Sequence, residues 1–200
     1  QPWVDLFRER GYDASAPGWP GDAGTVADTR ASSNAVAGHG IQDVVERYAA
    51  AIATLPEKPI VIGHSFGGLI AQRLLGENNA AAAVAIDPAP MKGVLFLPFS
   101  ALRVAGIALR DPRNRNGAVS LNAGQFRYGF GNAVTQSESD ELFERWTIPS
   151  PGRPLFEAAS ANLMPHSPAS VATGNPSRGP LLLTAGGKDH TVPATLSRQA

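Results

Sequence analysis

Cysteine is absent from this chain of 200 residues. Without thiols the chain forms neither disulfide bonds nor thiolate metal sites, although this leaves the cellular compartment open. An excess of charge of either sign is also missing, because 17 Lys and Arg residues balance 17 Asp and Glu residues. The balance gives no electrostatic reason to expect a nucleic acid or an anionic membrane as a partner.

Long apolar runs are missing as well. No run approaches the roughly 18 residues that a membrane-spanning helix needs, so we expect no membrane span. The first residues, QPWVDLFRERGY, lack the basic start and apolar core of a secretory signal. We therefore expect a cytoplasmic protein, and because the chain begins at Gln1 rather than Met, secretion through an upstream signal stays open.

Apolar residues recur in two periodicities. Helical spacing of three and four predicts helices over residues 3–10, 41–55 and 66–74. Short apolar runs predict buried parallel strands in PIVIG (59–63), AAAVAIDP (81–88) and PLLLTAGG (180–187), and a further short strand in YDASA (12–16). Helices that alternate with strands predict an α/β fold with a parallel sheet flanked by helices.

Residues 88–178 interrupt this alternation. The stretch is far longer than a crossover between neighbouring strands needs, and it holds eight of the 14 aromatic residues. Ser137 followed by Asp140 predicts the start of a helix within it. Disordered linkers contain few aromatic residues, so we interpret residues 88–178 as an inserted helical lid. Residues 1–87 and 179–200 then form the core.

The sequence Gly63-His64-Ser65-Phe66-Gly67 fits the pattern G-x-S-x-G, and Gly68 follows it. A buried strand precedes the pattern and an amphipathic helix follows it, which is the context of a nucleophile elbow. Small residues on either side let the backbone turn sharply, so Ser65 is expected to present its hydroxyl near the start of a helix. Free N–H groups there stabilise an oxyanion, and Phe66 would supply one of them. The alternative is that Ser65 only caps the helix.

The segments VIGHSFGG, AIDPAP and LLLTAGGKDHTVP together resemble enzymes of the α/β-hydrolase fold, of the lidded lipase and esterase kind. The resemblance covers essentially the whole chain. It implies that Ser65 is the nucleophile and that Asp189, in GGKDHTVP, is the acid that orients the catalytic histidine. Asp87, in IDPAP, is the alternative acid, and either aspartate could instead hold a turn.

None of the four histidines fits the role of base. His39 precedes a helix, His64 lies inside the elbow, His166 lies among prolines of the lid, and His190 directly follows the candidate acid. The resemblance implies a base beyond Ala200, and three strands with a second oxyanion donor before Gln1. We therefore expect a fragment of a longer hydrolase that neither folds stably alone nor turns over substrate, because the strand at residues 12–16 would lack a neighbour.

The function implied by the resemblance is hydrolysis of a carboxylic ester, without metal or other cofactor, on a small and apolar substrate. Acyl transfer, perhydrolysis, C–C bond hydrolysis and a non-catalytic binding role are the alternatives, because the fold alone does not choose among them. Aromatic side chains of the lid either line the substrate pocket or pack the lid's own core; they are Phe96, Phe99, Phe126, Phe130 and Trp146.

Overall fold

The computed structural model describes residues 2–95 and 98–199. Its order of elements is α1 (Pro2–Glu9), α2 (Val26–Ala31), η1 (Ser33–Val36), α3 (Ile41–Ile52), β1 (Ile60–His64), α4 (Phe66–Gly76), β2 (Ala82–Ile86), α5 (Phe99–Leu109), η2 (Pro112–Asn116), β3 (Ala118–Val119), α6 (Ala123–Gly129), α7 (Gln136–Trp146), β4 (Ser150–Pro151), α8 (Arg153–Ala159), η3 (Ala161–Leu163), β5 (Leu181–Thr184) and α9 (Ala194–Ser197).

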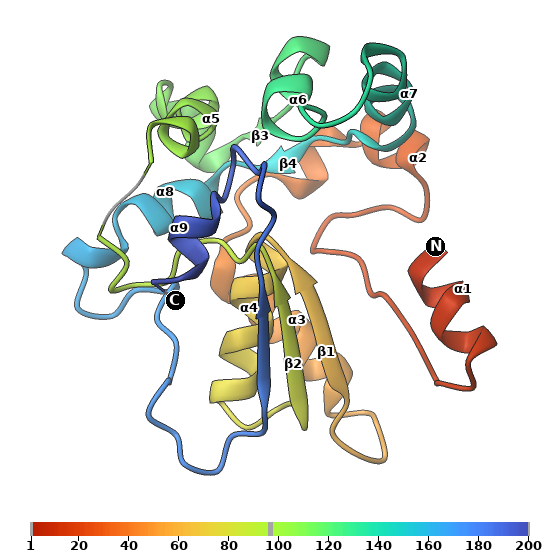
Figure 1. Ribbon diagram of the computed structural model, residues 1–200, viewed down its shortest axis with the longest axis vertical. Coiled ribbons are helices and arrows are strands. Elements are labelled where there is room, and N and C mark those ends of the chain that lie inside the picture. Colours follow the sequence, from red (N-terminus) through yellow and green to blue (C-terminus); the bar gives the residue numbers. More distant parts are fainter. Residues whose placement is uncertain (1, 96–97, 200) are drawn as a thin grey trace.

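The central sheet has three parallel strands in the order β1-β2-β5 (Figure 1). Its register pairs Gly63 of β1 with Ala85 of β2, and Ala85 with Leu183 of β5. Parallel strands end at the same edge of a sheet, so the residues that follow β1, β2 and β5 lie close together. The three strands predicted from apolar runs near these positions are confirmed.

One face of the sheet is covered by α4, with α3 packed beside it. In this layer Ile41, Val44, Leu69, Ile70 and Leu74 form one buried cluster. The helical spacing predicted from sequence over residues 41–55 and 66–74 is confirmed in α3 and α4. The start of α3 is fixed by two carboxylates, because Asp43 accepts the N–H of Gly40 and Glu157 accepts that of Ile41.

The opposite face of the sheet is apolar and exposed. Ile60 on β1 retains 62% of its accessible surface, and Leu182 on β5 retains 56%. Parallel sheets normally bury both faces. The helix α1 also buries none of its residues, and it lies apart from the sheet in Figure 1.

Two local predictions are wrong. Residues 12–16 form no strand, and Tyr12 is exposed, because no described strand lies beside this segment to accept and donate ladder hydrogen bonds. The helix predicted to begin at Ser137 begins earlier: Thr135 is its N-cap, and the Thr135 hydroxyl accepts the N–H of Glu138. A threonine makes this capping bond as a serine does, so the cap pattern alone did not fix the residue.

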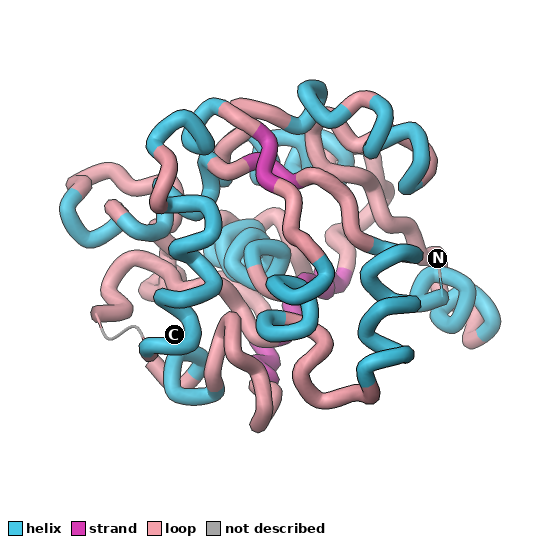
Figure 2. Tube along the Cα trace, turned by 90° about the horizontal axis from the view of Figure 1, so that it is seen from above, coloured by secondary structure: helices cyan, strands magenta, loops and turns pink. Residues whose placement is uncertain are grey.

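The helices α5, α6, α7 and α8, with the short antiparallel pair β3 and β4, come from residues 88–178. They gather beyond the carboxyl edge of the sheet, at the top of Figure 1, and Figure 2 shows them from above. Phe96, one of the predicted pocket residues, lies outside the described residues. In the described part of the chain, no helix is long and apolar enough to cross a membrane.

Candidate active site

Ser65, Asp87 and Asp189 each follow a strand at the carboxyl edge of the sheet. Backbone hydrogen bonds extend the ladder past the strand ends: the N–H of Ser65 donates to the Ile86 carbonyl at 3.0 Å, and the N–H of Asp87 donates to the Thr184 carbonyl at 2.9 Å. The Ser65 carbonyl in turn accepts the N–H of Ala89 at 2.9 Å. These bonds fix the turn after β1 beside the turn after β2.

The backbone of Ser65 is in a conformation that residues with side chains rarely adopt. Its φ is 53° and its ψ is −120°, and a positive φ at a non-glycine residue stores strain that the surrounding structure must hold. Ser65 stands in the N-cap position of α4, yet its side chain makes no capping hydrogen bond. The geometry is that of a serine held at a sharp strand-to-helix turn with its hydroxyl uncommitted to the helix.

The glycines around Ser65 are not equivalent. A Cβ on Gly63 would collide with the backbone of Gly67, and a Cβ on Gly68 would lie 3.0 Å from Pro88. A Cβ on Gly67 would meet no atom within 4 Å. Gly63 and Gly68 therefore allow the close passage of the backbone, whereas the expectation that Gly67 is needed for it is wrong.

Phe66 is the first residue of α4. The first N–H groups of a helix have no partner inside it, and they point toward the positive end of the helix dipole. Its N–H is therefore suitably placed, on the residue directly after Ser65, for the oxyanion role that sequence reasoning assigned to it.

The two candidate acids are held by backbone N–H groups. Oδ1 of Asp189 accepts the N–H of Thr191 at 2.6 Å and that of Val192 at 2.8 Å. Oδ1 of Asp87 accepts the N–H of Gly186 at 2.5 Å, and Asp87 is only 9% exposed. Asp189 thus makes the local turn contact that sequence reasoning weighed as its alternative role, whereas Asp87 instead binds the loop that follows β5.

His64 joins the two acids. Ligand atoms of His64, Asp87 and Asp189 all lie within 4.8 Å of one another, and among the described residues this is where three potential metal ligands converge. An imidazole and two carboxylates are chemically able to bind a divalent cation. Sequence reasoning placed His64 only inside the elbow and missed this group. The signal was available, because each of the three residues lies within two residues of the end of a predicted parallel strand.

The remaining histidines lie elsewhere. Nδ1 of His190 is 2.8 Å from the Tyr128 carbonyl, and the two rings contact each other. Nδ1 of His39 is 4.0 Å from an Asp43 carboxylate oxygen, and His166 is exposed on a different cavity. Among the described residues, His39 and His190 thus contact groups other than Ser65, and His166 lies at a different cavity.

Ser65 opens on a cavity of about 1010 Å³ between the sheet edge and the helices of residues 88–178. Phe126, Phe130 and Trp146 line this cavity, which is one of the two alternatives weighed for them, and Phe126 stacks on Phe130 with ring centroids 5.7 Å apart. Phe99 does not line it and is 79% exposed, so that prediction is wrong. Phe99 is the first residue of α5, and its side chain lies on the exposed side of that helix.

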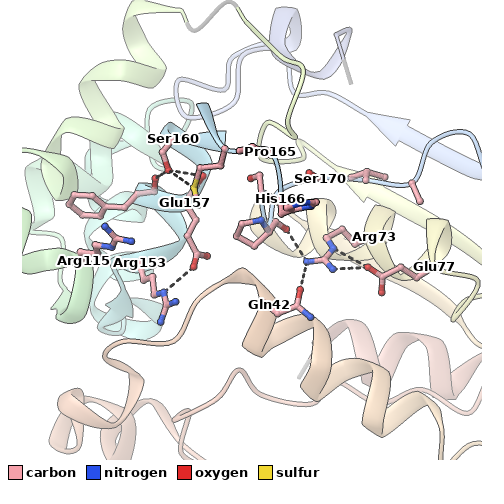
Figure 3. A pocket seen from close by; sticks show the side chains of 16 residues that line it. Gln42, Arg73, Glu77, Arg115, Arg153, Glu157, Ser160, Pro165, His166 and Ser170 are labelled. Carbon is pink, nitrogen blue, oxygen red and sulfur yellow. Dashed lines mark hydrogen bonds and ion pairs between the residues drawn. The ribbon is translucent and has the colours of Figure 1, made fainter. Parts of the chain in front are cut away.

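A second cavity of about 870 Å³ lies away from Ser65, between α8 and the α3–α4 pair (Figure 3). Of the three arginines among its described lining residues, two are paired with a glutamate. Arg73 binds Glu77 at 2.6 Å and also donates to Gln42 and to the Pro168 carbonyl, and Arg153 binds Glu157 at 2.9 Å. These bonds tie the helical layers together, and we assign no ligand to this cavity.

A parallel sheet with a strained serine at the strand-to-helix turn, and aspartates after two further strands, defines the architecture of an α/β hydrolase. The sequence matches the alpha/beta hydrolase family over residues 2–200. The chain belongs to this family. Among curated proteins, no match was found.

Solved structures of the same fold resemble the chain at low sequence identity. An extracellular alpha/beta-hydrolase from a Paenibacillus species has a TM-score of 0.59 and 18% identity, over 94% of this chain and 84% of that one. A monoacylglycerol lipase from Paleococcus ferrophilus has a TM-score of 0.53 and 20% identity, over 82% of this chain and 60% of that one. A pyrethroid hydrolase from Sphingobium faniae has a TM-score of 0.55 and 18% identity, over 98% of this chain and 75% of that one.

Proposed function

We propose that the protein hydrolyses carboxylic esters through an acyl-enzyme on Ser65. The observation that carries the proposal is the Ser65 side chain itself, which is held at a positive φ, makes no capping bond and lines an apolar cavity. Strain of this kind persists where the surrounding structure maintains it, and it is concentrated at functional sites. The monoacylglycerol lipase among the similar structures favours the same chemistry, although at 20% identity it establishes the fold alone.

In this proposal Oγ of Ser65 attacks the ester carbonyl. The Oγ–C bond forms, the bond to the alcohol oxygen breaks, and a histidine base takes the serine proton and passes it to the leaving alcohol. Water then cleaves the acyl-enzyme by the same route and releases the acid. The Phe66 N–H stabilises the oxyanion, and Asp189 orients the histidine, with Asp87 as the alternative acid.

The base in this proposal lies outside residues 1–200, in a longer parent chain, because His39 and His190 contact other groups, His166 lines a different cavity and His64 lies against the acids. The second oxyanion donor comes from the same parent. Residues 88–178 act as its lid. Residues 1–200 alone are then inactive and poorly stable, consistent with the exposed apolar face of the sheet.

The test is labelling of the parent protein with a fluorophosphonate, which reacts with activated serines. We expect one label, mapped to Ser65 by peptide mass, and its loss in Ser65→Ala together with ester hydrolysis. Ser120→Ala is the matched control and keeps both. A folded parent that is not labelled would contradict the proposal and favour a binding protein. If residues 1–200 alone melt cooperatively and show Ser65-dependent hydrolysis, the proposal that the base lies outside residues 1–200 is wrong.

Product analysis separates ester hydrolysis from the related reactions of the same nucleophile. With an alkyl ester as substrate, we expect the free acid and alcohol in equal amounts. Three other outcomes would contradict ester hydrolysis as the main reaction. Transfer of the acyl group to an added alcohol would indicate an acyltransferase, and formation of a peracid in the presence of peroxide would indicate a perhydrolase. Cleavage of a C–C bond in preference to the ester would indicate a C–C hydrolase.

A further inference from the structure

The cavity next to Ser65 has an uneven distribution of charge. Among its described lining residues there is no lysine, arginine or glutamate, and Asp22 is the single carboxylate. The carboxylates of Asp87 and Asp189 are not part of the lining. An anionic substrate group would meet no cationic partner here, whereas a cationic group would meet one carboxylate.

Two aromatic residues accompany Asp22. Trp19 lies on the same loop, and Tyr48 comes from α3; both line the cavity and pack against the buried cluster that contains Ile41 and Val44. The Tyr48 hydroxyl donates to the Pro17 carbonyl at 2.9 Å, which fixes the ring relative to this loop. Carboxylates and aromatic rings are the two groups that bind ammonium ions in proteins.

The carboxylate of Asp22 is held in place through one of its two oxygens. Oδ2 accepts the N–H of Trp19 at 2.8 Å, and the N–H of Asp22 donates back to the Trp19 carbonyl at 3.0 Å. Oδ1 has no hydrogen bond among those of the described residues. Burial raises the pKa of Tyr48, and the negative charge of Asp22 raises it further, so the field of this carboxylate reaches the ring.

Other charged groups do not cancel Asp22 inside the cavity. Arg47 is the cation that acts on Tyr48: it lowers the pKa of Tyr48, but it is exposed, donates to the Gly18 carbonyl at 2.7 Å and does not line the cavity. Exposed charges are strongly screened by water and salt. His64, the other titratable lining group apart from Tyr48, lies with Asp87 and Asp189.

We propose that Trp19, Asp22 and Tyr48 bind a cationic amine, so that the substrate is an ester with a protonated or quaternary amine at one end and an apolar portion at the other. The ester part of this inference rests on the proposed function of Ser65; the binding of the amine does not. The apolar walls formed by Phe126, Phe130 and Trp146 receive the uncharged portion.

The test is a binding measurement that needs no chemistry. The Ser65→Ala parent protein is titrated by calorimetry with butyrylcholine and with its uncharged isostere, 3,3-dimethylbutyl butyrate. We expect butyrylcholine to bind about tenfold more tightly, in the range of a partly buried cation–π and carboxylate contact. Asp22→Asn should abolish this preference, because the amide retains an oxygen for the Trp19 N–H but loses the charge. Trp19→Leu should weaken it.

Asp13→Asn is the matched control, since Asp13 is exposed and outside the cavity lining, and it should keep the preference. Melting curves of each variant establish that it is folded. Equal affinity for the two ligands, no binding of either, or a preference that survives in folded Asp22→Asn would overturn the inference. The proposed function fails separately, if the fluorophosphonate does not label Ser65.

Discussion

The N–H of Gly186 donates a 2.5 Å hydrogen bond to Oδ1 of Asp87. This bond joins the turn after β5 to the turn after β2, and a Cβ on Gly186 would lie 3.3 Å from Oδ2 of the same carboxylate and 3.6 Å from the Cβ of Asp189. Gly186 therefore lies next to both candidate acids, Asp87 and Asp189. Substitutions of the two aspartates can distinguish their roles.

Asp189→Asn should lower kcat of the parent protein by about 10³–10⁴-fold, because an amide does not hold the histidine in the correct tautomer. Asp87→Asn should lower kcat less, but it should reduce the free energy of unfolding by about 1 kcal/mol, because the amide accepts the Gly186 N–H through a neutral hydrogen bond in place of a charged one. Steady-state kinetics and urea unfolding measure the two effects. The reverse order in kcat would assign the acid role to Asp87.

Alanine substitutions at Gly63 and Gly67 of the elbow should have different effects on the free energy of unfolding. Gly63→Ala should reduce the free energy of unfolding by about 1–3 kcal/mol, since its Cβ collides with the backbone of Gly67. Gly67→Ala, in open space on the first turn of α4, should leave it unchanged or raise it by up to about 1 kcal/mol. Equal destabilisation by the two changes, measured by urea unfolding, would show that the elbow does not pack as described.

Tyr48 should contribute to the loss of stability in alkali. Its pKa in the folded protein is raised above the ordinary tyrosine value of 10.0 by burial and then by the charge of Asp22. The folded state therefore retains the phenol proton more strongly, and this contribution is full below pH 10 and is lost as the pH rises through the folded pKa. Melting curves from about pH 9 to pH 11 should decline less for Tyr48→Phe than for the wild type. The exposed Tyr12 supplies the control, and Tyr12→Phe should follow the wild type.

Aromatic residues that line the cavity should contribute to substrate binding, whereas aromatic residues of the same region that lie outside it should not. Trp146→Ala should raise KM for a long-chain ester by about tenfold, because it removes a large apolar contact. Phe99→Ala removes an aromatic ring that does not line the cavity, so KM should stay within about twofold of the wild type. A comparable rise in KM for both variants would show that the substrate does not occupy this cavity.

The group of His64, Asp87 and Asp189 should act without a metal. Dialysis of the parent protein against EDTA should leave ester hydrolysis unchanged, because in the proposed mechanism Asp189 orients a histidine rather than a cation. Loss of activity on dialysis, followed by recovery with one divalent cation, would contradict this prediction and assign the group to metal binding.

Much of the fold could be predicted because local patterns coincide with tertiary burial. The apolar run before Ser65, the helical spacing after it and the runs ending near Asp87 and Gly186 gave three strands and the elbow helix at nearly their observed bounds. The prediction of a strand at residues 12–16 was wrong because the local pattern there does not coincide with tertiary burial. A strand exists only through its neighbour, and no local pattern in Tyr12–Ala16 reports whether a neighbour is there.

The sequence by itself determined the strand-turn-helix around Ser65, since glycines and apolar spacing act over a few residues. Only the tertiary structure decided that His64 meets Asp87 and Asp189, that Phe99 faces away from the cavity while Trp146 lines it, and that Asp22 is the single carboxylate among the cavity's described lining residues. These relationships join segments far apart in the chain. They depend on strand register and on the packing of helices over the sheet edge, which no short stretch of residues encodes.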